Sequence, residues 1–225
     1  NEVGILIPAY QPDESLTHLS FEIKKFFKDL NFSIIIVNDG SNYSKSLKIL
    51  EILSKERFIH IINHNKNIGK GGAIKTGLNY LKKKTFDYVI TADADGQHTP
   101  SDIFKVCKTV TNDGVFTIGQ RSFNNEVPLR NKFGNIIIRY FFNFFYNYTI
   151  KDTQSGLRAF PTNYIDDFLK IKNNGYDYEF AMLILASKNK KISKVSIETI
   201  YQKENYTSHF RPLLDSGLIY LVLLR

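Results

Sequence analysis

The chain has 225 residues, of which 43% are hydrophobic and 23% are charged, and its formal net charge is +8. This composition is typical of a globular protein with one large domain or two small ones, and it excludes a disordered or low-complexity chain. The positive balance favours anionic partners such as nucleotide phosphates or an anionic membrane surface. No nucleic-acid-binding motif accompanies it, so we expect no nucleic-acid partner.

The single cysteine, Cys107, lies between Val106 and Val110 in an apolar-periodic segment. It cannot form an intrachain disulfide and is most simply a small core residue. A chain without disulfide chemistry is consistent with a reducing cytosol. Residues 3–8 are too few for a signal peptide and run straight into the fold, so we expect no secretory leader.

The first half of the chain predicts strands and helices in strict alternation. Apolar runs predict strands over residues 4–8, 32–37, 58–62, 88–92 and 115–119. Helical spacing predicts one helix that starts at a Ser15 cap, one marked by apolar residues over 47–53, one that follows from the glycine-rich segment 63–77 and one that starts at a Ser101 cap. This alternation predicts an α/β fold, with a mostly parallel central sheet and helices on both faces.

Polar residues follow four of the predicted strands at their carboxyl ends, the edge at which open α/β sheets bind ligands. Asp93 and Asp95 follow the strand over residues 88–92, and Gln97 comes two residues later. Mg²⁺ typically takes one or two carboxylates and completes its shell with water and substrate phosphates. The simpler alternative is a turn in which Asp caps backbone N–H groups. The convergence of four polar segments on one edge favours the metal site.

The glycine-rich segment 63–77 enters a helix, but it lacks the spacing of a P-loop or of a dinucleotide fingerprint. Gly69, Gly71 and Gly72 allow the backbone to approach a ligand closely. The same glycines are equally typical of a tight turn between a strand and a helix, and both interpretations stay open.

The second half of the chain changes character. Residues 132–150 predict a helix that is apolar nearly all round, buried in a core or dimer interface or lying in a membrane interface, and too interrupted to span. A polar loop and a short strand over 152–160, helices over 162–171 and from about 175, and a strand over 192–200 follow. Residues 212–225 are apolar, so we expect a domain over 1–211 followed by a membrane-associated segment or a docked terminal helix.

Five segments, in order along the chain, resemble glycosyltransferase family 2 with the GT-A fold, and within it the polyprenyl-phosphate glycosyltransferases. They are Pro8-Ala9-Tyr10, Asn38-Asp39-Gly40-Ser41, residues 67–73, Asp93-Ala94-Asp95-Gly96-Gln97-His98 and residues 152–158. The resemblance implies a nucleotide-diphosphate sugar donor, a lipid-phosphate acceptor and a Mg²⁺ or Mn²⁺ cofactor. It is specific for the fold and the reaction class and weaker for the sugar.

The resemblance also implies roles for individual residues. The nucleotide side comprises Pro8, Ala9, Tyr10, Asp39, Lys70, Gly71, Asp93 and Ala94, with Asp13 or Glu14 as a further acid because Gln11-Pro12 departs from the family's pattern. Asp95 and Gln97, with Asp93, would bind the metal. Arg121 and Arg130 fit basic residues near the phosphates, and Glu179 fits a position near the donor sugar. Gly96 stands where the family usually has an apolar residue.

The resulting hypothesis is an inverting transfer of a hexose from a UDP- or GDP-sugar to a polyprenyl phosphate at the cytoplasmic side of a membrane, and it admits a homo-oligomer. A saccharide hydroxyl is the alternative acceptor, and Glu179 or Asp152 would then be the general base. A nucleotidyltransferase is disfavoured because residues 9–14 contain no Gly, Lys or Arg. A non-catalytic, membrane-attached nucleotide-binding domain is the remaining alternative.

Overall fold

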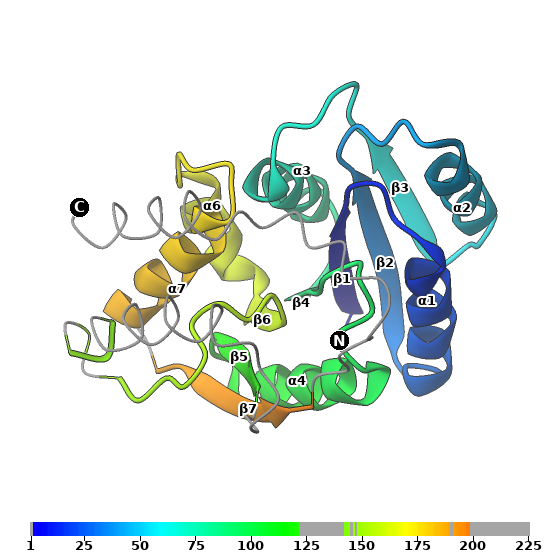
Figure 1. The fold of residues 1–225 in the computed structure, drawn as a ribbon. Coiled ribbons are helices and arrows are strands. Elements are labelled where there is room, and N and C mark those ends of the chain that lie inside the picture. Colours follow the sequence, from blue (N-terminus) through cyan, green and yellow to red (C-terminus); the bar gives the residue numbers. More distant parts are fainter. Residues whose placement is uncertain (1, 122–141, 145, 147, 190, 199–225) are drawn as a thin grey trace.

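The computed structural model describes residues 2–121, 142–144, 146, 148–189 and 191–198 (Figure 1). Its centre is a seven-stranded sheet with the strand order β3-β2-β1-β4-β6-β5-β7. The strands are β1 (Glu2–Ala9), β2 (Asn31–Asn38), β3 (Ile59–Asn63), β4 (Tyr88–Thr91), β5 (Thr117–Arg121), β6 (Arg158–Pro161) and β7 (Ser193–Ile197).

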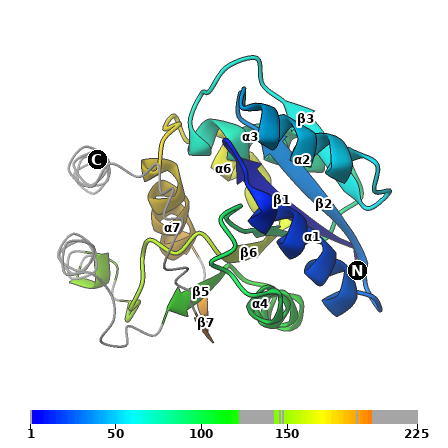
Figure 2. The same cartoon turned by 45° about the vertical axis from the view of Figure 1, so that its right-hand side comes forward.

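Helices cover both faces of this sheet (Figures 1 and 2). The face that carries Leu6 packs against α3 (Lys70–Lys82), α6 (Ile165–Leu169) and α7 (Asp177–Asn189). The face that carries Ile5 packs against α1 (Glu14–Phe26), α2 (Ser44–Ser54) and α4 (Pro100–Asp113). Successive strand residues point to opposite faces, so the near-continuous apolar run of β1 supplies both halves of the core.

The predicted α/β class with a mostly parallel sheet is confirmed. β1 pairs in parallel with β2 and β4, β2 with β3, and β5 with β7. β6 lies between β4 and β5 and runs antiparallel to both. Because β6 reverses direction against each neighbour, β4 and β5 run the same way. The carboxyl ends of β1, β2, β4 and β5 therefore share one edge, as the polar segments predicted.

Two helices begin earlier than predicted, and the two serine caps are wrong. α1 is capped by Asp13, whose carboxylate accepts a hydrogen bond from the Ser15 amide at 2.8 Å. α4 is capped by Thr99, whose hydroxyl accepts from the Asp102 amide at 3.0 Å. Pro100 then occupies the first turn, where its fixed φ suits a helix and its missing N–H costs nothing.

Other boundaries also shift. The helix predicted over 162–171 is a 3₁₀ turn, η1 (Thr162–Tyr164), followed by the short α6. β5 begins two residues later than predicted, since Gly114 first ends α4 in the left-handed conformation. Most of the aromatic segment 132–150, all of residues 212–225 and the predicted boundary at 211 lie outside the described residues. None of the described helices is long and apolar enough to cross a membrane.

Cys107 lies in the core between α4 and the sheet, with 1% of its surface exposed, as predicted. Burial raises the pKa of its thiol to about 11, so little thiolate exists at pH 8. We expect the folded protein to be inert to a thiol reagent at pH 8 and to react at one thiol per chain in guanidinium chloride. Reaction of the folded protein at the rate of the unfolded one would contradict this placement.

Candidate functional site

A lysine bridge between two carboxylates forms the centre of the site. The Lys70 ammonium lies 2.6 Å from Asp93 Oδ1 and 2.7 Å from Glu179 Oε2. Lys70 is the first residue of α3, Asp93 follows β4, and Glu179 belongs to the first turn of α7. The bridge therefore joins three elements that are far apart in the sequence, and it brings together three of the residues that the sequence predicted.

Two glycines leave space for the side chains in and beside this bridge. A side chain at Gly156 would collide with the carboxylate of Asp93, and one at Gly71 would collide with Tyr178 beside Glu179. The other oxygen of the Asp93 carboxylate also has a partner, since Oδ2 lies 3.2 Å from Nε2 of the buried His98. Asp93 is thus held on both of its oxygens by the protein itself.

The charges in the bridge stabilise one another. Burial alone would lower the pKa of Lys70, but the carboxylates of Asp93 and Glu179 raise it well above its ordinary value. Burial likewise opposes ionisation of Asp93, but the Lys70 ammonium and His98 hold the pKa of Asp93 far below its usual range. Lys70 and Asp93 are therefore both charged at neutral pH.

Glu179 keeps one oxygen without a partner in the described part of the chain. Its side chain is 7% exposed, and Oε1 accepts no hydrogen bond there. A buried carboxylate oxygen without a donor is costly, so such an atom indicates a place for a ligand donor. The role near the donor sugar that the resemblance implies for Glu179 stays a prediction.

Asp95 has a different environment from Asp93. It is exposed, and its Oδ1 accepts the Gln97 amide N–H at 3.0 Å. Neighbouring protein atoms that displace water, and then the charge of Asp93, raise the pKa of Asp95 above its ordinary value. A nearby divalent cation would remove this penalty on the charged form.

The donor set fits a Mg²⁺- or Mn²⁺-type ion that is shared with a diphosphate. The described residues contain no cluster of three or more His, Cys, Asp or Glu side chains arranged to hold a metal. Mg²⁺ usually needs only one or two carboxylates when substrate phosphates complete its shell. Asp95 is the available ligand, with the half-buried Gln97 beside it, whereas Asp93 is engaged with Lys70 and His98.

Asp39, at the end of β2, anchors the glycine-rich loop. Its Oδ1 accepts from the Ile68 amide at 3.0 Å and its Oδ2 from the Gly69 amide at 2.9 Å. Oδ1 also lies 2.7 Å from Nδ1 of His64. Only 3% of the surface of Asp39 is exposed, so its carboxylate interacts mainly with these groups of its own chain.

The other predicted nucleotide residues lie on a second stretch of the same edge. Pro8 and Ala9 end β1, and Tyr10 follows with 38% of its surface exposed. Asp13 is committed to capping α1, and Glu14 is the exposed first residue of that helix.

Gln11 adopts a positive φ of 51°, which is unusual for a residue other than glycine. Its side chain bonds Asn42 and Tyr43, so it ties this loop to the one after β2.

Arg121 and Asp152 form a separate bidentate pair. Arg121 donates from Nε to Oδ2 at 2.5 Å and from Nη2 to Oδ1 at 3.1 Å, and Asp152 is completely buried. The pair joins the end of β5 to the polar loop before β6. This geometry commits the Asp152 carboxylate to Arg121, which weakens the alternative of Asp152 as a general base.

Two further predicted site residues remain. Arg130 lies outside the described residues, and Ala94 is half-buried between the two aspartates.

Arg158 was not predicted as a site residue, although it belongs to one of the five segments. It is completely buried at the start of β6 and donates to the backbone oxygens of Ser155 at 2.9 Å, Thr153 at 3.2 Å and Glu179. Burial lowers its pKa, while the charges of Glu179, Asp152 and Asp93 oppose that shift. Apart from its place in that segment, its only signal in the sequence was a charged residue at the start of an apolar strand.

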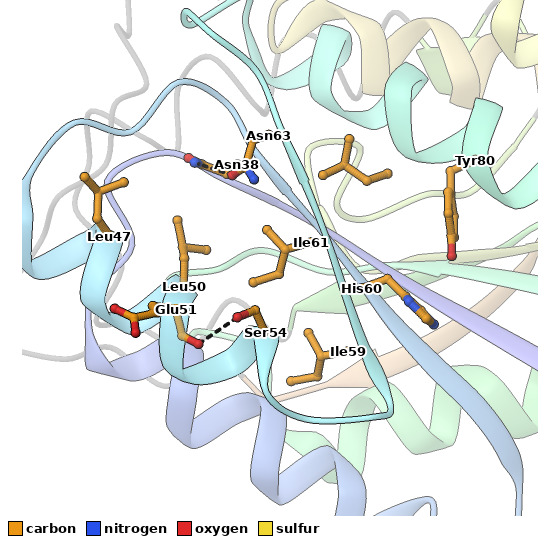
Figure 3. Close-up of a pocket in the computed structure, with 11 residues that line it drawn as sticks. Asn38, Leu47, Leu50, Glu51, Ser54, Ile59, His60, Ile61, Asn63 and Tyr80 are labelled. Carbon is orange, nitrogen blue, oxygen red and sulfur yellow. Dashed lines mark hydrogen bonds between the residues drawn. The ribbon is translucent and has the colours of Figure 1, made fainter.

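A hollow of about 540 Å³ lies elsewhere, along the outer edge strand β3. Figure 3 shows Leu47, Leu50 and Glu51 of α2 on one side of β3 and Tyr80 of α3 on the other. The amides of Asn38 and Asn63 bond each other at 2.9 Å within it. It lacks a cluster of charged side chains, so the lysine bridge remains the candidate site.

Comparison with known proteins agrees with this geometry. Residues 4–169 match the model of glycosyl transferase family 2. The chain is 32% identical to a UDP-N-acetylglucosamine–dolichyl-phosphate N-acetylglucosaminyltransferase of Methanococcus voltae, over 99% of this chain and 95% of that protein. It is 30% identical to a dolichyl-phosphate beta-glucosyltransferase of Dictyostelium discoideum, over 87% of this chain and 65% of that protein.

Solved structures share the fold at low sequence identity. Mannosyl-3-phosphoglycerate synthase from Rubrobacter xylanophilus superposes with a TM-score of 0.76 at 18% identity, over 100% of this chain and 73% of that chain. Glucosyl-3-phosphoglycerate synthase from Mycobacterium tuberculosis, in a complex with Mn²⁺, UDP and glucosyl-3-phosphoglycerate, gives 0.67 at 16% identity, over 99% and 78%. The GT-A fold prediction is confirmed.

The buried Arg158 generates a stability prediction. We expect Arg158→Lys to lower the free energy of unfolding by about 2–3 kcal/mol, because the ammonium of lysine cannot reproduce the planar guanidinium group that donates to three backbone carbonyls. Urea denaturation measures the change. Lys170→Met is the control, since this exposed ammonium forms a surface salt bridge with the exposed Asp167 and its loss should change stability by less than about 1 kcal/mol. Equal effects of the two substitutions would contradict the structural role of Arg158.

Proposed function

This chain belongs to glycosyl transferase family 2, and we propose that it transfers a sugar from a nucleoside-diphosphate sugar to the phosphate of a polyprenyl lipid at a membrane surface. The observation that carries the donor half of the proposal is the contrast between the two aspartates. Asp93 is paired with Lys70, while the exposed Asp95 offers an oxygen to a cation at the carboxyl end of β4.

The acceptor half rests on the relatives. The two similar proteins from Methanococcus voltae and Dictyostelium discoideum are named for transfer to dolichyl phosphate. The net charge of +8 is consistent with an anionic acceptor and with an anionic membrane surface. Solved structures with the same fold are named for transfer to 3-phosphoglycerate, another phosphate-bearing molecule, so the fold alone does not select the lipid.

The proposed reaction is a single displacement with inversion. An oxygen of the acceptor phosphate forms a bond to the anomeric carbon of the sugar. The bond from that carbon to the diphosphate oxygen breaks, and the nucleoside diphosphate leaves with the electron pair. The acceptor is already an anion, so the step needs no strong general base.

The chain's own residues would position the substrates. Lys70 places a fixed positive charge at the donor edge, and Oε1 of Glu179 would accept a hydrogen bond from a sugar hydroxyl. Asp95 and Gln97 would hold a Mg²⁺ or Mn²⁺ ion, which when bound supplies Lewis-acid stabilisation of the charge on the leaving diphosphate.

Donor binding is tested by substitution of Asp95. We expect Asp95→Ala to abolish the Mn²⁺-dependent part of UDP or GDP binding and to lower turnover by at least about 100-fold, because removal of such a charge ligand costs several kcal/mol. Isothermal titration calorimetry, with and without Mn²⁺, measures the binding. Asp29→Ala is the control, since Asp29 is an exposed carboxylate at the far end of β2. The donor half fails if Asp95→Ala binds nucleotide as the wild type does.

Acceptor choice needs a separate experiment. Radiolabelled UDP- and GDP-sugars are offered with polyprenyl phosphate in anionic vesicles, with a saccharide, or with 3-phosphoglycerate. We expect product only with the lipid phosphate, extractable into organic solvent. Transfer to the saccharide or to 3-phosphoglycerate alone would reject the lipid acceptor and leave the donor half standing.

A further inference from the structure

We propose that His64 is a positioning residue that acts through Asp39 and the glycine-rich loop to hold Lys70 at the donor site. The inference rests on the proposed donor binding and deepens it. His64 directly follows β3 and was not among the predicted site residues.

His64 lies between two fixed partners. Its Nδ1 is 2.7 Å from Asp39 Oδ1, and its Nε2 is 2.9 Å from the hydroxyl of Thr76 on α3. The side chains of His64 and Asp39 are only 13% and 4% exposed. An ionised carboxylate can only accept, so Nδ1 carries the proton that it donates to Asp39. In a neutral ring Nε2 then accepts from Thr76, and the two contacts fix the ring.

The imidazole completes the shell of Asp39. A carboxylate has about four lone-pair sites, and Asp39 fills three of them with N–H donors from His64, Ile68 and Gly69. Two of these donors are loop amides. The ring is the only side-chain donor of the three, so it decides whether the carboxylate stays turned toward the loop.

The loop in turn places Lys70. Gly69 adopts a φ of 96°, which suits glycine, and it directly precedes the first residue of α3. Asp39 holds the Gly69 amide from one side, and the Asn174 carbonyl accepts from the Gly72 amide at 3.1 Å on the other. Lys70 is held between these two points, and its ammonium reaches Asp93 and Glu179. A small rotation at Gly69 would therefore move the ammonium away from the diphosphate.

Two substitutions of His64 separate its two contacts. In His64→Asn the amide nitrogen takes the place of Nδ1 and keeps the bond to Asp39. In His64→Gln the amide takes the place of Nε2 and keeps only the contact with Thr76. We expect His64→Gln to weaken Mn²⁺-dependent binding of UDP or GDP, whichever the wild type binds, by about 10-fold, and His64→Asn to stay within about 2-fold.

The experiment is calorimetric titration of both variants, in the wild-type background and with Lys70→Gln. Because His64 acts through Lys70, we expect His64→Gln to change affinity by less than about 2-fold once Lys70 is replaced. Circular dichroism confirms that each variant is folded at the assay temperature. A purely structural role would weaken binding equally in both backgrounds and would not distinguish Asn from Gln.

The outcomes separate the two proposals. If the wild type binds neither nucleotide, the proposed function fails and this inference fails with it. If the wild type binds but His64→Gln binds equally well, or loses affinity equally in the Lys70→Gln background, only the role of His64 is overturned. If His64→Gln does not fold, His64→Asn decides: retained affinity supports the role, and a 10-fold loss overturns it.

Discussion

The position of one ammonium group determines the arrangement of the whole site. Lys70 lies between Asp93 and Glu179, two carboxylates that would repel each other if they were placed together without it. It thereby joins the carboxyl end of β4 to the first turns of α3 and α7. Gly71 and Gly156 are needed for the same reason, because a side chain at either would displace a group that packs against the bridge.

Local patterns in the sequence predicted the frame of this site and one of its central residues. Apolar runs mark β1, β2 and β4 because each is buried on both faces, and a polar residue at a strand end marks the sheet edge. Asp93 and Asp95 stand out for that reason alone. Lys70 and Glu179 came only from the resemblance to a family, since a lysine and a glutamate at helix starts are ordinary surface residues by composition.

The remaining features depend on contacts between distant segments, which no local pattern shows. Arginine is usually a surface residue. The burial of Arg158 is understood only from the tertiary structure, which places three backbone carbonyls around its guanidinium group. β6 is a short apolar strand in the sequence, but its antiparallel insertion between β4 and β5 follows from tertiary pairing. The environment of Asp39 is a third case, because the three N–H donors to its carboxylate come from the glycine-rich loop and from His64, both distant from Asp39 in the sequence.

The two aspartates after β4 belong to one motif but differ in their partners and in their exposure to solvent. If both carboxylates were without protein partners, they would repel each other until a cation bound between them. Lys70 and His98 already stabilise the charged form of Asp93. The negative potential that they leave uncompensated acts on Asp95. Glu179 keeps Lys70 from cancelling that potential, since it shares the ammonium. One ammonium shared by Asp93 and Glu179 leaves these carboxylates and Asp95 with a net negative charge, so a cation that bridges a diphosphate would be attracted to the exposed Asp95.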